Sequence, residues 1–201
     1  MTLTPEENVS VDEIKLEATK ILGGADITIA GNRIIERDDL AIVSVATPLS
    51  GDAALKRALK AGHGLAMPSA TCSTTSKNGM RAVNTAPDQM LLVFAHTTPD
   101  AEHHVQTGLK GTGYTTDQTD SLVAIEISGP DTMAAMERLC PLDLHPDNFC
   151  TDMAGRTVME HMAATIICLA DAHFLLLAAS SSGLSFLHAI ETSYRNVTGA
   201  A

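Results

Sequence analysis

Apolar and polar positions follow the same order twice along this chain. An apolar run over residues 40–46 predicts a buried strand, and residues 51–59 carry apolar side chains three and four positions apart, which predicts a short helix. The apolar run over 122–128 and the helical spacing over 129–139 repeat that order. Two strand-helix pairs are therefore expected about eighty residues apart.

Each pair is followed by two apolar strands around an Asp-containing turn and then by another helix. The expected hairpins and helices cover residues 80–94 and 99–109 in the first unit, and 165–177 and 182–194 in the second. The predicted fold is therefore α+β, with duplicated strand-helix-hairpin-helix units that form mostly antiparallel sheets packed with helices.

The predicted domain covers residues 26–201, with repeat units at about 26–110 and 120–197 and a polar connection between them. Residues 1–25 are expected to be an acidic N-terminal extension. Within it, residues 11–22 predict a helix with a thin apolar stripe that Gly23 and Gly24 end. A partner-binding or loosely packed arm is the favoured interpretation of this extension.

Composition and charge restrict the possible partners. Hydrophobic residues make up 45% of the 201 and charged residues only 18%, which is typical of a globular protein. The net charge of −11 argues against nucleic acid and against an anionic membrane surface. No continuous apolar segment predicts a signal peptide or a membrane span, and the four cysteines are unclustered, so a cytoplasmic protein with reduced thiols is expected.

Residues 140–149, CPLDLHPDNF, predict a stiff connector after a helix. Pro141 and Pro146 fix their own φ and push Cys140 and His145 toward extended geometry. The spacing of Cys140, His145 and Cys150 matches part of a zinc-knuckle pattern, but Glu137 stands near the position that a further thiolate needs. The simpler interpretation is that Cys140 packs beneath the connector while Asp143 and His145 bond backbone groups.

Other polar residues are weaker candidates. Three histidines of the second unit are expected to be half-buried and satisfied, a paired histidine to lie on a solvated helix face, and three serines to cap the last helix. These residues are His161, His173 and His188, then His103-His104, then Ser180–Ser182. The residues alone therefore predict no catalytic, cofactor-binding or metal site on this chain.

The connector closely resembles the CPLDLHP-type segment of the gamma subunit of heterotetrameric sarcosine oxidase. The resemblance extends to residues 125–130, IEISGP, to Arg156-Thr157, and to the final apolar hairpin and helix. Upstream, residues 86–92 read APDQMLL where that family usually shows a Gly-Pro-Asp-Glu-Trp-Leu-Leu-type turn.

The resemblance implies a fold like that of the folate-binding aminomethyltransferases. It also implies a complex that oxidatively demethylates sarcosine to glycine and forms hydrogen peroxide and 5,10-methylenetetrahydrofolate. FAD, FMN, NAD, tetrahydrofolate and zinc would lie on the alpha, beta and delta partner subunits, with no cofactor on this chain. The alternatives are the equivalent subunit of an N-methylglutamate dehydrogenase and a free-standing folate-binding aminomethyltransferase.

An assembly role points to the connector as the interface with a larger subunit. The alternative is that the connector only closes this domain's own core. The expected interface residues are Pro141, Leu142, Asp143, Leu144, His145, Pro146 and Phe149.

Overall fold

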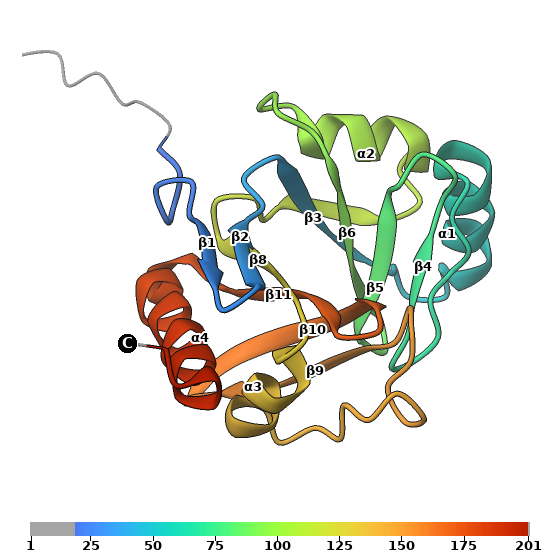
Figure 1. Cartoon of the computed structure of the whole chain (residues 1–201). Coiled ribbons are helices and arrows are strands. Elements are labelled where there is room, and N and C mark those ends of the chain that lie inside the picture. The colour runs from blue at the N-terminus through green and yellow to red at the C-terminus, as the bar shows by residue number, and fades with distance from the viewer. Residues whose placement is uncertain (1–18, 201) are drawn as a thin grey trace, which may run out of the picture.

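Two antiparallel sheets lie at the centre of the computed structural model, which describes residues 19–200 (Figure 1). The first sheet has five strands in the order β4 (Ser73–Thr75), β5 (Arg81–Ala86), β6 (Gln89–Ala95), β3 (Leu40–Ala46) and β7 (Tyr114–Asp117). The second has six, in the order β1 (Asp26–Ile29), β2 (Asn32–Glu36), β8 (Leu122–Ser128), β11 (His173–Ala179), β10 (Met162–Ala170) and β9 (Ala154–Met159).

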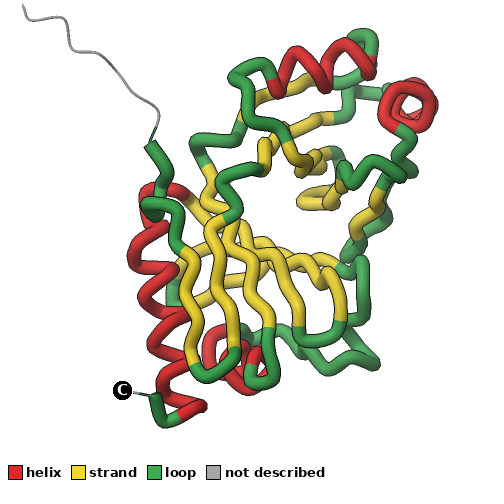
Figure 2. The backbone as a smooth tube through the Cα atoms, turned by 45° about the horizontal axis from the view of Figure 1, so that its top comes forward, coloured by secondary structure: helices red, strands yellow, loops and turns green. Residues whose placement is uncertain are grey.

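Helices cover the outer face of each sheet, as Figure 2 shows. The first sheet carries α1 (Asp52–Ala58), which continues into the π-helical turn η1 (Leu59–His63), and α2 (Ala101–Leu109). The second carries α3 (Thr132–Leu139) and α4 (Gly183–Thr198), which the short 3-10 turn η2 (Ser180–Ser182) precedes. No helix within residues 19–200 is long and apolar enough to cross a membrane.

The central strands are buried on both faces, which explains their continuous apolar runs. In β8, Val123 and Ile125 pack in the core beneath α3 and α4, whereas Ala124 between them packs with side chains of the other sheet. In β3, Val43 faces the core beneath α1 and α2, and Ile42 faces the second sheet. The result is four layers in the order helix, sheet, sheet, helix.

The predicted α+β fold and its duplication are confirmed, because the strand orders β7-β3-β6-β5-β4 and β2-β8-β11-β10-β9 correspond position by position. The unit boundaries differ from the prediction. The strands of residues 26–36 belong to the second sheet, where Ile34 of β2 pairs with Ile127 of β8. The polar connection after α2 contains β7, which pairs with β3 through Ala46 and Tyr114.

The segment before β1 is tied to the second unit. Ile21 and Leu22 pack against the region around Gly183 and Val123, and the Glu36 carboxylate accepts hydrogen bonds from the backbone N–H groups of Leu22 (2.8 Å) and Gly24 (2.6 Å). The predicted helix over 11–22 lies mostly outside the described residues, and its last four residues are not helical. This difference follows from Glu36, which binds backbone N–H groups at a turn.

Candidate functional site

The connector begins where α3 ends, at Cys140. Cys140 has φ −117° and ψ 125°, the extended geometry that the following proline predicts. Its backbone N–H still donates to the carbonyl of Met136 at 2.8 Å, so the helix closes its last turn before the chain leaves.

The connector has an inner and an outer side. Cys140, Leu144 and Phe149 are buried in the core beneath α3 and α4, and the Phe149 ring lies 6.4 Å from that of Phe174. Leu142 is half-buried against Gly155. The outer side consists of the exposed residues Pro141, Asp143, His145 and Pro146. Of the seven expected interface residues, Leu144 and Phe149 therefore serve this chain's own core.

Hydrogen bonds fix the shape of the outer side. Asp143 accepts from the backbone N–H of His145 at 3.0 Å and from the Asn148 side chain at 2.5 Å, and these two bonds lower the pKa of its carboxyl. The His145 carbonyl accepts from the backbone N–H groups of Asn148 and Phe149, both at 2.8 Å. The predicted bonding of Asp143 to the backbone is confirmed.

The zinc-knuckle pattern is not a ligand set in the structure. Cys140 is buried, where desolvation raises the pKa of its thiol, while His145 and Cys150 are exposed. No group of three His, Cys, Asp or Glu side chains within residues 19–200 could hold a metal ion.

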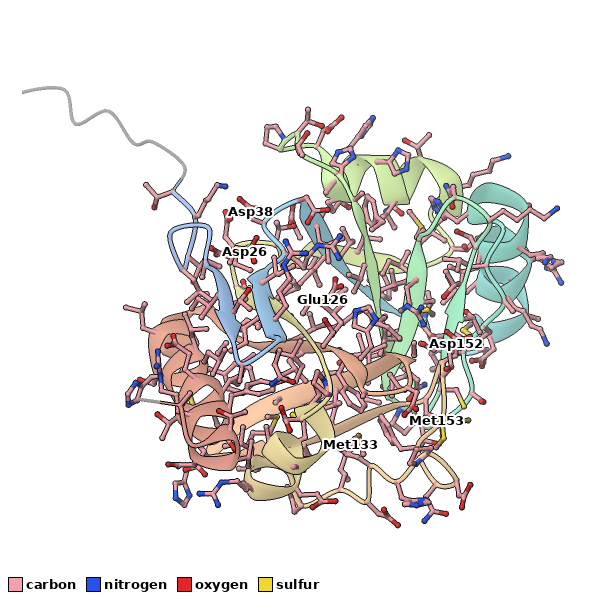
Figure 3. The ribbon with its side chains drawn as sticks, viewed as in Figure 1. Asp26, Asp38, Glu126, Met133, Asp152 and Met153 are labelled. Atoms are coloured by element: carbon pink, nitrogen blue, oxygen red, sulfur yellow. The ribbon has the colours of Figure 1, made fainter. Side chains whose placement is uncertain are left out.

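Two hollows border the connector. A groove of about 400 Å³ runs between α3 and the connector and is lined by Met133, Glu137, Leu142 and Pro146 among others, with no Lys or Arg. A smaller cavity of about 100 Å³ lies on its other side, beside Phe174 and Cys168. Figure 3 labels Met133 on α3, one of the residues that line the groove.

A larger cleft of about 510 Å³ opens at the edge between the two sheets. Its apolar wall includes Ile42 and Val123, and its rim carries Asp117, Asp120 and His96. The sequence did not predict this cleft because its walls come from segments about eighty residues apart that meet only in the folded chain.

A partly buried charge network adjoins this cleft through Arg37. The Arg37 guanidinium donates to both oxygens of Asp39, at 2.7 and 2.8 Å, and also to Glu126. His173 Nε2 donates to the other Glu126 oxygen at 2.7 Å. Glu126 is central between the sheets in Figure 3 and its side chain is only 17% exposed. The expectation that His173 is half-buried and satisfied is confirmed.

Several aromatic rings lie close to His104 on α2, where the sequence predicted a solvated helix face. The His104 ring lies 5.6 Å from His96, 5.7 Å from Phe94 and 6.0 Å from the buried His63, so this exposed side chain is not simply solvated. Hydrogen bonds from Thr98 and His96 lower the pKa of Asp100 to about 2, which keeps that carboxylate charged beside His96.

The polar candidates that remain from the sequence are Ser180–Ser182, His161 and His188. Ser182 is the N-cap residue of α4 but makes no side-chain capping bond, so the predicted capping role of the serines is wrong for this residue. The reason is that Ser180–Ser182 form the 3-10 turn η2, which leads directly into the helix. His161, in a tight turn at φ 69°, and His188, on α4, are both exposed, so the expectation that they are half-buried is wrong for these two histidines.

Known proteins are similar to this chain in fold, and the comparisons by sequence find no match. No family model and no curated protein matches the chain. Among solved structures, a chain of heterotetrameric sarcosine oxidase from Corynebacterium sp. U-96, in complex with pyrrole 2-carboxylate, superposes with a TM-score of 0.73 at 19% identity, covering 90% of this chain and 91% of that one.

A second match is the glycine cleavage system aminomethyltransferase T from Bartonella henselae. Its TM-score is 0.56 at 10% identity, over 81% of this chain, and this chain spans 46% of that one. The protein thus has the fold of a chain of heterotetrameric sarcosine oxidase and of part of an aminomethyltransferase.

Proposed function

We propose that this chain is the gamma-type, non-catalytic assembly subunit of a heterotetrameric sarcosine oxidase complex. The observation that supports the proposal is the coextensive match, which covers 90% of this chain and 91% of its counterpart. Each chain is therefore matched over about nine tenths of its length by the other. The aminomethyltransferase match lacks this property, since this chain spans less than half of that protein.

The proposed complex oxidatively demethylates sarcosine to glycine, with formation of hydrogen peroxide and 5,10-methylenetetrahydrofolate. In this proposal FAD, FMN, NAD, tetrahydrofolate and zinc belong to the alpha, beta and delta subunits. The present chain contributes an ordered surface on which a larger subunit assembles. An N-methylglutamate dehydrogenase would use such a subunit in the same way, so the substrate is assigned by turnover measurements on the complex.

The outer side of the connector is the proposed docking surface. Leu144 and Phe149 anchor it in the core, and Asp143 closes its turn through two hydrogen bonds. Pro141 and Pro146 restrict its backbone further. A surface that is already ordered loses little conformational entropy on association, which favours binding.

Exchanging exposed residues of the outer side tests this surface. His145→Glu with Pro146→Glu places two carboxylates on the proposed interface without touching the core, because both residues are exposed. We expect the variant to fold as a monomer that loses no more than about 1 kcal/mol of stability through the replaced proline. We also expect it to lose the large subunits on affinity isolation, because a buried unpaired charge costs about 3–5 kcal/mol.

The matched control is His188→Glu with Thr192→Glu on the exposed face of α4, which should retain the large subunits. Leu144→Ala is the comparison for folding and should destabilise the monomer by about 2–5 kcal/mol. Retention of the large subunits by the connector variant would contradict docking at this surface.

A further inference from the structure

Positive charge is concentrated in one stretch of this acidic protein. Residues 53–87 contain five of the 13 Lys and Arg residues and none of the 24 Asp and Glu residues. The remainder of the chain is correspondingly more acidic than the net charge of −11 indicates.

The fold gathers most of these cations on the outer surface of the first unit. Along α1 and η1, Leu55 and Leu59 point into the core, while Lys56, Arg57 and Lys60 are exposed. Figure 3 shows nitrogen-tipped side chains projecting from the outer side of α1.

Two further exposed lysines lie in loops that are next to α1 and η1. The loop that holds Lys77 approaches the end of η1, where a Cβ on Gly64 would lie 3.9 Å from the Ser76 side chain. The loop that holds Lys110 approaches the inner side of α1, where a Cβ on Gly113 would lie 3.1 Å from the buried Leu55. We call the five exposed residues Lys56, Arg57, Lys60, Lys77 and Lys110 the basic stripe.

Several other cations of the chain are paired with carboxylates, whereas in the described part of the chain those of the basic stripe are not. Lys20, Arg33, Arg37 and Arg81 each form a salt bridge with an Asp or Glu side chain. Within residues 19–200, no salt bridge involves a residue of the stripe. Among residues 19–200, the five cations of the stripe therefore have no salt-bridge partner.

We propose that the basic stripe docks on an acidic face of a different protein chain. Complementary charge speeds association and selects the partner and its orientation. Nucleic acid and anionic membranes fit less well, because the other faces of this molecule are acidic and would be repelled by an extended polyanion. The stripe also has no Phe, Tyr or Trp between residues 53 and 87 on which bases could stack.

The stripe and the connector belong to different layers. The stripe lies over the first sheet with α1, whereas the connector follows α3 over the second sheet. The inference therefore adds a second contact surface beyond the one in the proposed function, and it holds for any complex in which this chain takes part.

Direct cross-linking of amines to carboxylates tests the inference. The tagged full-length chain is isolated from its native cells in about 50 mM salt, where charge pairing is weakly screened. It is then treated with a carbodiimide, and the linked peptides are mapped by mass spectrometry. We expect Lys56, Lys60 or Lys77 to be joined to Asp or Glu side chains of another protein.

A matched pair of variants measures the contribution of the charge. Lys56→Glu/Lys60→Glu should lower recovery of that protein at least about tenfold, and Arg33→Glu/Arg156→Glu, with the same change in net charge, should leave recovery unchanged. Full recovery with Lys56→Glu/Lys60→Glu overturns this inference alone. Cross-links only to a second copy, or recovery of nuclease-sensitive nucleic acid, also overturn it. A wild-type chain isolated without any other protein overturns both this inference and the proposed function.

Discussion

Glu126 holds a charge at a position with limited access to water. Desolvation opposes its ionised form, but hydrogen bonds from His173 and Arg37 outweigh that effect and lower the pKa of the carboxyl. On its other side, Arg37 is fixed by both oxygens of Asp39, and this bonding raises the pKa of its guanidinium. The Glu126 carboxylate on β8 therefore links Arg37, which follows β2, to His173 on β11.

Neutralising this carboxylate should weaken the fold. A Glu126→Gln variant leaves Arg37 and His173 without their anionic acceptor, so we expect a loss of about 1–3 kcal/mol in the free energy of unfolding at neutral pH. Because the folded-state pKa lies below the unfolded value, the wild-type contribution is present above the ordinary glutamate pKa of 4.5 and is lost as the pH falls through the folded-state pKa.

Urea unfolding at pH 7 and at about pH 4 measures this effect, and the gap between wild type and variant should narrow at the lower pH. Glu137→Gln is the control, since Glu137 is exposed and forms no salt bridge within the described residues. A constant gap at both pH values would contradict the assignment of the network to Glu126.

At the scale of elements, periodicity predicted the parts whose burial repeats regularly. The strands Leu40–Ala46 and Leu122–Ser128 match the predicted runs, because both faces of each are covered. Strands β1 and β7 were missed, because they are short, lie at sheet edges and have mostly exposed residues. Their apolar signal is therefore too weak to separate them from loops.

In the connector, the sequence pattern predicted the backbone geometry but not which side chains are buried. Its two prolines predicted the extended geometry at Cys140 and the end of the helix at Leu139. They could not separate Leu142 from Leu144, which are chemically identical and only two positions apart. The structure buries Leu144 to 4% exposure and leaves Leu142 half-buried, a difference that depends on the second sheet and α3.

Close helix contact in the first unit depends on two glycines. A Cβ on Gly62 of η1 would lie 2.4 Å from the carbonyl oxygen of Gly108 in α2, where no side chain can move away. We expect Gly62→Ala to destabilise the protein by about 1–3 kcal/mol, because η1 and α2 must separate. Ala61→Ser at the neighbouring exposed position is the control, and equal melting temperatures for the two variants would contradict this contact.

For the whole molecule, the duplicated four-layer fold leaves two outer surfaces of different character. The connector and its groove lie on the side of α3, and the basic stripe lies on the side of α1. A subunit that assembles with two chains, or with two parts of one chain, needs such separate surfaces. The central claim, that this chain is an assembly subunit, therefore concerns what accompanies it in the cell.

Isolation of the tagged chain from its native cells, followed by mass spectrometry and an absorbance scan, tests that claim most directly. We expect large subunits to accompany the chain with a flavin absorbance band, and the isolated complex to turn over sarcosine faster than N-methylglutamate. The reverse preference would assign the complex to N-methylglutamate oxidation. A colourless chain that is isolated alone, and that binds tetrahydrofolate by itself, would contradict the assembly account.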